Sequence, residues 1–289
     1  MTAVLDFWYA LGRNPLALHA LAVGLLASVA CGLVGTLVVT RRITYVAGGI
    51  SHSLLAGLGL AQWLRVMHHW NWVQPLHGAL AAAMLSVLII GWVTLRGRER
   101  EDTAIGAVWA IGMAIGFIFI HITDGAKQDL MSYLFGNILL VSSGQIWLIA
   151  LLDIMIIATV ILCHPELQAV CFDEEFARLR GMRVELWHML LLVLTALTVV
   201  LLVTVVGIVL VIALLTLPAA IAGRLSRSLA QMMVLSIVVC ALCTVVGLTI
   251  HYRPNLPPGP TIILVAGFLY ALAMLIPPRT WGKTLPRGD

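Results

Sequence analysis

The chain has 289 residues, of which 61% are hydrophobic and only 10% are charged, and its mean hydropathy is +1.04. Because soluble domains carry about 25% charged residues, this composition excludes an ordinary water-soluble protein and places the chain in a membrane. The net charge of +4 then reports on topology and indicates no nucleic-acid partner. No polar stretch of domain size interrupts the apolar segments, so we expect a single domain over 1–289.

Long apolar segments follow one another in chain order. Hydrocarbon offers no water to the backbone, so each spanning segment must be a helix of roughly 20 residues. The predicted fold class is all-α, a polytopic membrane helix bundle with about eight or nine transmembrane helices. The predicted spans are 16–40, 45–65, 76–95, 103–122, 130–163, 186–205, 206–222, 229–250 and 260–277. The N-terminus lacks the pattern of a removable signal peptide.

Two apolar stretches are too long for a single crossing. The first, 130–163, is expected to divide into an interfacial or re-entrant piece at 129–140 and a span from about 145 to 163. The second, 186–222, has room for two crossings with a reversal near Gly207.

Basic residues predict the orientation, because positively charged loops stay on the cytoplasmic side. If the loop that holds Arg41 and Arg42 is cytoplasmic, thirteen of the 17 Lys and Arg residues lie on that side and four on the other. We therefore expect the N-terminus outside and the C-terminus inside.

Small residues recur every four positions in the second predicted span, at Gly49, Ser53, Gly57 and Ala61, beside Gly48. Such a stripe lets a neighbouring helix approach closely. Close approach matters in lipid, where no hydrophobic force drives helices together. We interpret these positions as helix-packing residues.

His52 is the most informative polar residue of the chain. Counted from Ile43, it lies on the order of 14 Å into a core roughly 30 Å thick. Ionisable residues at such depth usually face the bundle interior or a wet cavity and mark ion pathways. His52 is thus a candidate residue of an ion pathway. A histidine hydrogen-bonded to a neighbouring helix is the alternative.

Asp153 is the only carboxylate well inside a predicted span. It could serve as a metal ligand, but we favour a structural hydrogen bond to another helix. Cys240 and Cys243 form a C-x-x-C that on a helix could bind a soft metal, although free cysteines usually pack as small apolar side chains.

A short polar segment at 173–181 separates the fifth and sixth spans. Asp173 can cap a helix N-terminus, the two glutamates that follow suit its positive end, Arg178 suits the other end, and Gly181 can stop it. We expect a short amphipathic helix on the cytoplasmic face, either a solvated connector or a docking element for a soluble partner.

Common catalytic motifs do not occur in the chain. Without a G-x-x-x-x-G-K-[ST] loop, ATP-driven work would need another chain as its motor. H-E-x-x-H and G-x-S-x-G are also absent, which removes frequent signatures of hydrolytic enzymes. We expect a transport subunit and not an enzyme.

Six short segments occur in a specific order and together carry a family resemblance. They are Gly35-Thr36-Leu37-Val38-Val39-Thr40-Arg41-Arg42, Ser51-His52-Ser53, Glu101-Asp102-Thr103-Ala104-Ile105-Gly106, Leu134-Phe135-Gly136-Asn137-Ile138-Leu139, Phe172-Asp173-Glu174-Glu175-Phe176-Ala177 and Leu217-Pro218-Ala219-Ala220. Over nearly its whole length the chain resembles the integral membrane permeases of ABC importers for zinc, manganese and iron ions.

The resemblance implies a type II ABC importer permease fold in the bacterial plasma membrane. It implies a homodimer or paired permease, two cytoplasmic ATPase subunits and an extracytoplasmic metal-binding protein. The segment 173–181 would be the coupling helix that seats on the ATPase. No cofactor would be bound permanently, and the cargo would be a divalent metal ion.

In this family a histidine of the second span works with an aspartate four residues earlier. Here His52 matches, whereas Gly48 stands at the aspartate position. The resemblance thus implies His52 as the pore ligand of the metal ion, with water or Ser51 completing the site. Imidazole suits Zn²⁺, and oxygen ligands suit Mn²⁺ better. We therefore expect zinc in preference to manganese or iron.

The leading hypothesis is the permease subunit of an ATP-driven divalent-metal importer with alternating access through a dimer pore. One alternative within transport is a permease for an iron chelate or a vitamin, in which His52 would be incidental. An alternative of another class is a membrane-embedded metal-dependent enzyme that uses His52, Asp153 or the cysteine pair. A purely structural scaffold is the third.

Overall fold

The computed structural model describes residues 14–70, 72–96, 100–123, 134–136, 138–251 and 256–276. Within these ranges the chain is almost entirely helical and contains no strand. The elements are α2 (Pro15–Thr40), α3 (Thr44–Met67), α4 (Pro75–Arg96), α5 (Glu101–Ile122), η2 (Ile138–Leu140), α7 (Ser143–Leu162), α8 (His164–Phe172), α9 (Glu174–Leu179), α10 (Val184–Val206), α11 (Ile208–Leu225), α12 (Leu229–His251) and α13 (Pro258–Met274).

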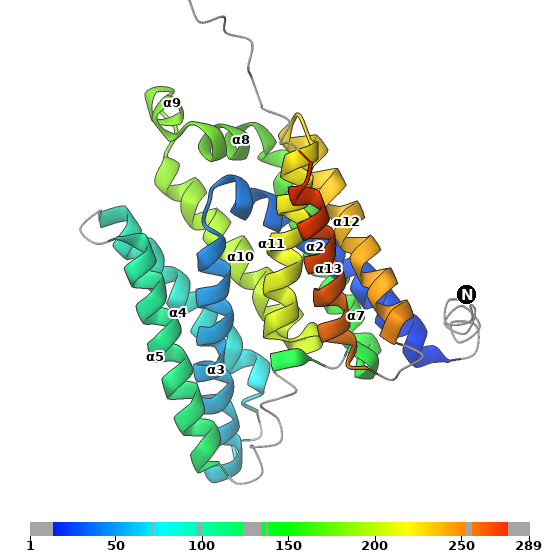
Figure 1. The fold of residues 1–289 in the computed structure, drawn as a ribbon. Coiled ribbons are helices and arrows are strands. Elements are labelled where there is room, and N and C mark those ends of the chain that lie inside the picture. The colour runs from blue at the N-terminus through cyan, green and yellow to red at the C-terminus, as the bar shows by residue number, and fades with distance from the viewer. Residues whose placement is uncertain are drawn as a thin grey trace, which may run out of the picture.

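Nine long helices of the described ranges, α2 to α5, α7 and α10 to α13, run alternately up and down (Figure 1). The short helices α8 and α9 lie across one end of the bundle, which we call the α9 end. Seven of the long helices have the length and apolarity to cross a membrane. Of the other two, α13 is shorter, and α3 is less apolar because polar residues surround His52. The predicted all-α membrane bundle is confirmed.

Gly207 divides the longest apolar run. α10 ends at Val206, α11 begins at Ile208, and the two helices run in opposite directions (Figure 1). Gly207 has φ +87°, a conformation that favours glycine, and a Cβ there would overlap the backbone of Gly136. The two crossings predicted within 186–222 are therefore present.

The stretch predicted as 130–163 divides into separate elements. Turn η2 precedes α7, whose start is fixed by a reciprocal capping box between Ser142 and Gln145. Residues 129–133 and Asn137 of the predicted interfacial piece lie outside the described residues. The span in this stretch is thus α7 alone.

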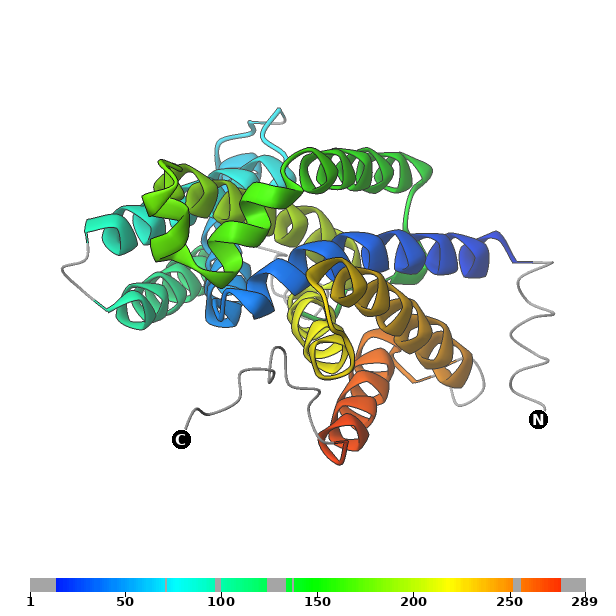
Figure 2. The same ribbon diagram turned by 90° about the horizontal axis from the view of Figure 1, so that it is seen from above.

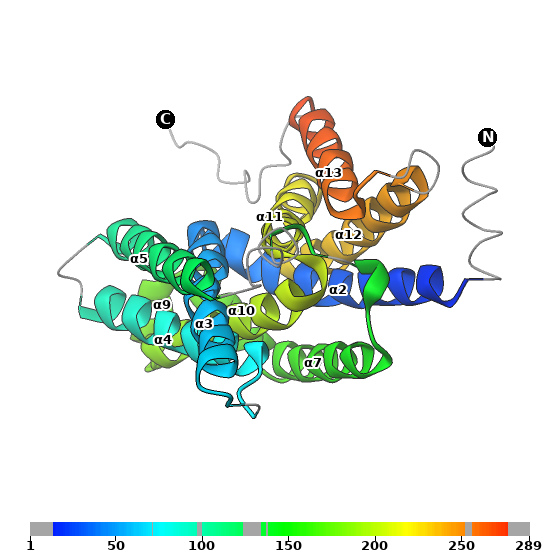
Figure 3. The ribbon, with the colours of Figure 1, turned by 90° about the horizontal axis from the view of Figure 1, so that it is seen from below.

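Two groups of helices stand side by side (Figures 2 and 3). In one group α2 packs against α12, α11 and α7, and its small residues are buried there. In the other group α3 packs against α5 and α4. α10 contacts both groups, so one continuous apolar core joins them. The helix that carries His52 thus lies at the boundary between the two groups.

Glycines make the closest contacts within the α3, α4 and α5 group. Gly57 of α3 faces Gly78 of α4 so closely that a Cβ on either would overlap the carbonyl oxygen of the other. On the α5 side, Gly49 lies against Ile105, and Gly112 lies against Ser53. The small residues of α3 therefore lie where α4 and α5 approach it.

Candidate functional site

His52 lies in the third turn of α3 and stacks on Trp109 of α5. The two ring centroids are 4.4 Å apart, and the planes differ by 8°. Nδ1 of His52 is buried and has no hydrogen-bond partner among the described residues. Buried polar groups are normally hydrogen-bonded, so this nitrogen is free to bind a ligand. The hydrogen bond to a neighbouring helix, which was the alternative, is not observed for Nδ1.

A cavity of about 430 Å³ lies beside the stacked rings, between α3 and α5 on one side and α11 and α13 on the other. Gly48 and Trp109 line it, and Tyr45, Thr216 and Tyr270 add hydroxyl groups. Gly48 lies one turn before His52 in a helix that starts at the α9 end. The cavity therefore extends from the stacked rings towards the α9 end.

The other two predicted ligands do not join His52 in a metal site. The hydroxyl of Ser51 is fully buried and donates to the carbonyl of Ala47 in its own helix, at 2.6 Å. Asp153 lies on α7 beside Ala30 of α2 and is 4% exposed. Neither of its carboxylate oxygens makes a hydrogen bond with the described residues. The hydrogen bond to another helix that we favoured for Asp153 is thus not formed with the part of the chain that the structure describes.

No three His, Cys, Asp or Glu side chains come together as a metal site within the described ranges. Cys240 and Cys243 are buried free thiols. In this conformation, one copy of the chain therefore contributes a single candidate metal ligand, the imidazole of His52, at the boundary between the two helix groups.

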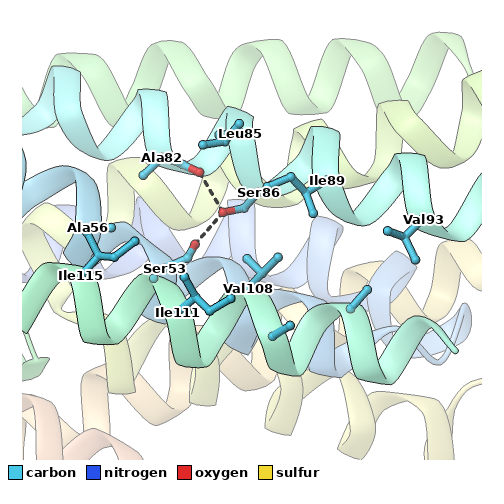
Figure 4. A pocket seen from close by; sticks show the side chains of 13 residues that line it. Ser53, Ala56, Ala82, Leu85, Ser86, Ile89, Val93, Val108, Ile111 and Ile115 are labelled. Atoms are coloured by element: carbon cyan, nitrogen blue, oxygen red, sulfur yellow. Dashed lines mark hydrogen bonds between the residues drawn. The ribbon is translucent and has the colours of Figure 1, made fainter. Parts of the chain in front are cut away.

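A second cavity, of about 320 Å³, opens between α3, α4 and α5 (Figure 4). At its inner side the hydroxyls of Ser53 and Ser86 hydrogen-bond at 2.7 Å, and Ser86 donates to the carbonyl of Ala82 at 2.8 Å. Aliphatic side chains form most of the remaining lining. Because its polar groups satisfy one another, this surface suits lipid chains better than ions.

The polar segment predicted at 173–181 forms α9. Asp173 caps it, since its carboxylate accepts a hydrogen bond from the backbone N–H of Phe176 at 2.9 Å. Gly181 follows with φ +77°. Phe176 and Leu179 are 46% and 88% exposed, and the guanidinium of Arg180 lies 4.8 Å from the centre of the Phe176 ring. α9 thus presents apolar side chains at one end of the bundle.

Glu174 connects α9 to the rest of the bundle. One carboxylate oxygen pairs with Arg41 at 3.0 Å, and the other pairs with Arg178 at 3.0 Å. Burial acts to raise the pKa of Glu174, but the hydrogen bonds and charges of these two arginines outweigh it and hold the pKa below its ordinary value. The carboxylate is therefore ionised near neutral pH.

Trp109 is a site residue that the sequence did not reveal. The one feature of the sequence that could have indicated it is its position, because Trp109 is the ninth residue of α5. It thus lies away from the membrane interfaces where tryptophans usually gather. The sequence singled out Arg41 as a topology marker and as part of a family-like segment, but did not indicate that its side chain bonds both α8 and α9.

Comparisons with known proteins agree with this architecture. The family model described as "ABC 3 transport family" matches residues 14–277. A probable metal transport system membrane protein of Chlamydia trachomatis is 38% identical over 94% of this chain and 92% of its own. The manganese transport system membrane protein MntC of Listeria monocytogenes is 31% identical over 90% of each chain.

A solved structure shows the same architecture. The structure of PsaBC from Streptococcus pneumoniae in complex with Fab has a chain that superposes with a TM-score of 0.84 at 29% identity, over 96% of this chain and 97% of that one. Together with the family match, this similarity identifies the molecule: the chain belongs to the ABC 3 transport family, as a membrane-embedded transport subunit.

Proposed function

We propose that this chain, as one permease domain over 1–289, is the permease subunit of an ATP-driven importer of divalent metal ions. One observation carries the proposal: His52 places an imidazole inside a long helix of the bundle, stacked on Trp109, with a buried nitrogen that bonds no described residue. Relatives named as metal transport system membrane proteins support the class of substrate.

A second copy of the chain would complete the metal site. A single imidazole holds a metal ion weakly, and protein zinc sites usually have three or four protein ligands. Two His52 side chains, one from each protomer, with water completing the coordination, would bind an ion and still release it. Weak binding of this kind is what transport requires.

Zinc is our proposed cargo, on the basis of ligand chemistry. No carboxylate stands at position 48, so the site offers imidazole nitrogen and lacks the oxygen ligands that manganese prefers. The Listeria relative is named for manganese. Competition between the two ions for uptake is therefore the measurement that decides between them.

The α9 end would face the cytoplasm. Most of the described basic residues at the two bundle ends gather there, which agrees with the distribution expected for cytoplasmic loops. Those at the α9 end are Arg41, Arg42, Arg100, Arg178, Arg180, Arg183, Arg224 and Arg227, whereas Arg65 lies near the opposite end of α3. The N-terminus would lie outside and the C-terminus inside. The cavity beside Trp109 would then be the cytoplasmic half of the route.

α9 would be the coupling helix on which a separate ATPase chain seats. Its exposed Phe176 and Leu179 offer an apolar contact, and the surrounding arginines and glutamates offer a polar rim. Asp173, Glu175, Ala177 and Gly181 would shape this helix and its ends. An extracytoplasmic metal-binding protein would deliver the ion at the opposite end of the bundle.

The proposal can be tested by measuring metal uptake into vesicles that contain the permease, the ATPase and the binding protein. His52→Ala should lower zinc uptake at least tenfold at normal expression. His121→Ala, which changes an exposed histidine at the far end of α5, is the matched control and should transport normally. Wild-type uptake by His52→Ala would exclude the assigned role. If the vesicles take up a metal chelate and free zinc does not compete with that uptake, the result would favour a chelate permease.

A further inference from the structure

Arg41 joins three elements at the α9 end. It is the C-cap residue of α2. One guanidinium nitrogen donates to the carbonyl of Val170 in α8 at 2.8 Å, and another donates to Glu174 of α9 at 3.0 Å. The side chain is only 15% exposed. Arg41 therefore ties α8 and α9 to the connection between α2 and α3.

That connection is short and well defined. The backbone N–H of Arg42 donates to Val39, and that of Ile43 donates to Val38, at 3.1 and 3.0 Å. Arg42 has φ +62°, so the turn is a Schellman motif with a non-glycine residue at the left-handed position. α3 begins at Thr44. His52 follows roughly 12 Å further along the helix axis at 1.5 Å per residue.

A second acidic side chain lies near Arg41. Glu101 and Arg41 line the same cavity of about 280 Å³, together with Glu174, and Arg41 interacts electrostatically with both carboxylates. Oε1 of Glu101 is buried and accepts no hydrogen bond from the described residues. Glu101 is the first residue of α5, the helix that carries Trp109. A buried carboxylate oxygen without a donor is costly, so a state in which a guanidinium bonds it would be favoured.

The other polar groups of this cavity do not make it a metal site. His188 is 4% exposed and neither ring nitrogen has a hydrogen-bond partner among the described residues. Glu185 pairs with Arg178 at 3.2 Å. These side chains do not converge as three metal ligands. What the cavity does provide is space in which the Arg41 side chain can change partner.

We propose that Arg41 is a positioning residue that bonds Glu174 in the state described here and bonds Glu101 in the other state of the transport cycle. The exchange would link α9 to the α3 and α5 pair, the helices that carry His52 and Trp109. An arginine that always keeps one carboxylate partner gives two discrete arrangements, as a switching element requires. This inference rests on the proposed role of α9 as the seat of the ATPase.

Glu101→Gln is the most direct test, because Glu101 makes no hydrogen bond or ion pair with the described residues in this state. The variant should fold and bind the ATPase normally. In vesicles that hold the complete transporter, the number of zinc ions imported per ATP hydrolysed should fall at least fivefold. A merely structural role predicts no change. Asp102→Asn removes the neighbouring exposed charge from the same first turn of α5 and should keep the wild-type ratio.

Arg41→Ala gives an independent arm of the test. It should also lower the ratio of zinc to ATP, and the double variant with Glu101→Gln should be no worse than Arg41→Ala alone, since both break one link. Three results would each overturn the proposed exchange. They are a wild-type ratio of zinc to ATP in Glu101→Gln, an equal fall of that ratio in Asp102→Asn, or a fall in the double variant equal to the product of the two single effects. The proposed role of α9 as the docking site of the ATPase is tested separately with a Phe176→Ala, Leu179→Ala double variant. If the ATPase still co-purifies normally with this variant, that role of α9 is excluded.

Discussion

The imidazole of His52 and the indole of Trp109 lie face to face across the contact between α3 and α5. Their centroids are 4.4 Å apart, and a Cβ added to Gly48 would lie 3.4 Å from the edge of the same indole. A methyl group at position 48 would therefore make an ordinary van der Waals contact with the indole. Gly48, His52 and Trp109 thus lie together at one end of the cavity between α3 and α11.

Loss of the stack should weaken transport. Trp109→Ala should lower zinc uptake about three- to tenfold, because a stacked aromatic pair contributes about 0.5–1.5 kcal/mol to fixing ring position. Trp109→Phe keeps a ring there and should stay within about twofold of wild type. Trp147 is 77% exposed on α7, so Trp147→Ala is the control, and uptake assays in vesicles provide the measurement. Equal uptake by all three variants would contradict the role of Trp109.

A methyl group at Gly57 should destabilise the bundle. Gly57→Ala places a Cβ against the carbonyl oxygen of Gly78, and overpacking of this kind costs about 1–3 kcal/mol. The thermal unfolding midpoint in detergent should fall by several degrees. Gly106 of α5 has nothing within 4 Å of an added Cβ. Gly106→Ala should therefore leave the midpoint unchanged or raise it, because alanine favours the helix more than glycine does. An equal loss in both variants would contradict the role of the close contact with Gly78.

Asp153 should be dispensable for transport. Its carboxylate is buried against α2 and accepts no hydrogen bond from the described residues, so Asp153→Asn removes a group that is costly to bury. We expect uptake within about twofold of wild type and an unfolding midpoint that is equal or higher. Uptake and thermal unfolding on one preparation check both. A tenfold loss of uptake would instead place Asp153 on the ion route.

The Glu174 ion pairs should give α9 a distinct pH dependence. Arg178 and Arg41 hold the pKa of Glu174 below its ordinary value of 4.5, against the opposing effect of burial. A carboxyl group with a lowered pKa in the folded state stabilises that state fully above its unfolded pKa. The contribution is lost as the pH falls through the lowered folded value. It is small, less than about 1 kcal/mol, because the side chain is 41% exposed and solvent screens the charges.

Thermal unfolding of wild type and Glu174→Gln between pH 7 and pH 3 measures this contribution. The difference between their midpoints should stay constant from pH 7 to about pH 5.5 and shrink below the ordinary pKa of 4.5. Glu175→Gln changes the exposed neighbour, which makes no ion pair with the described residues. It should show no such convergence. A gap between wild type and Glu174→Gln that widens towards acid pH would contradict the assignment.

Secondary structure and membrane class could be predicted from the sequence because they follow from local properties. Apolar runs of a set length must form helices in lipid, so 186–222 was divisible at Gly207 and 173–181 was recognisable from its capping residues. The division of 130–163 could also be predicted, since α7 begins at Ser143 after its Ser142 cap, close to the start expected at about 145. Depth in the membrane singled out His52 for the same local reason.

The sequence by itself determined the helices, their order and which few polar side chains lie within them, since hydropathy and capping act over neighbouring residues. Only the tertiary structure decided which of these side chains meet. Trp109 reaches His52 from a separate helix, and Arg41 reaches Glu174 across more than a hundred residues. Asp153 is buried against α2 and bonds none of the described residues. Such pairings depend on how closely glycine-lined helices approach and rotate against each other, which no local pattern encodes.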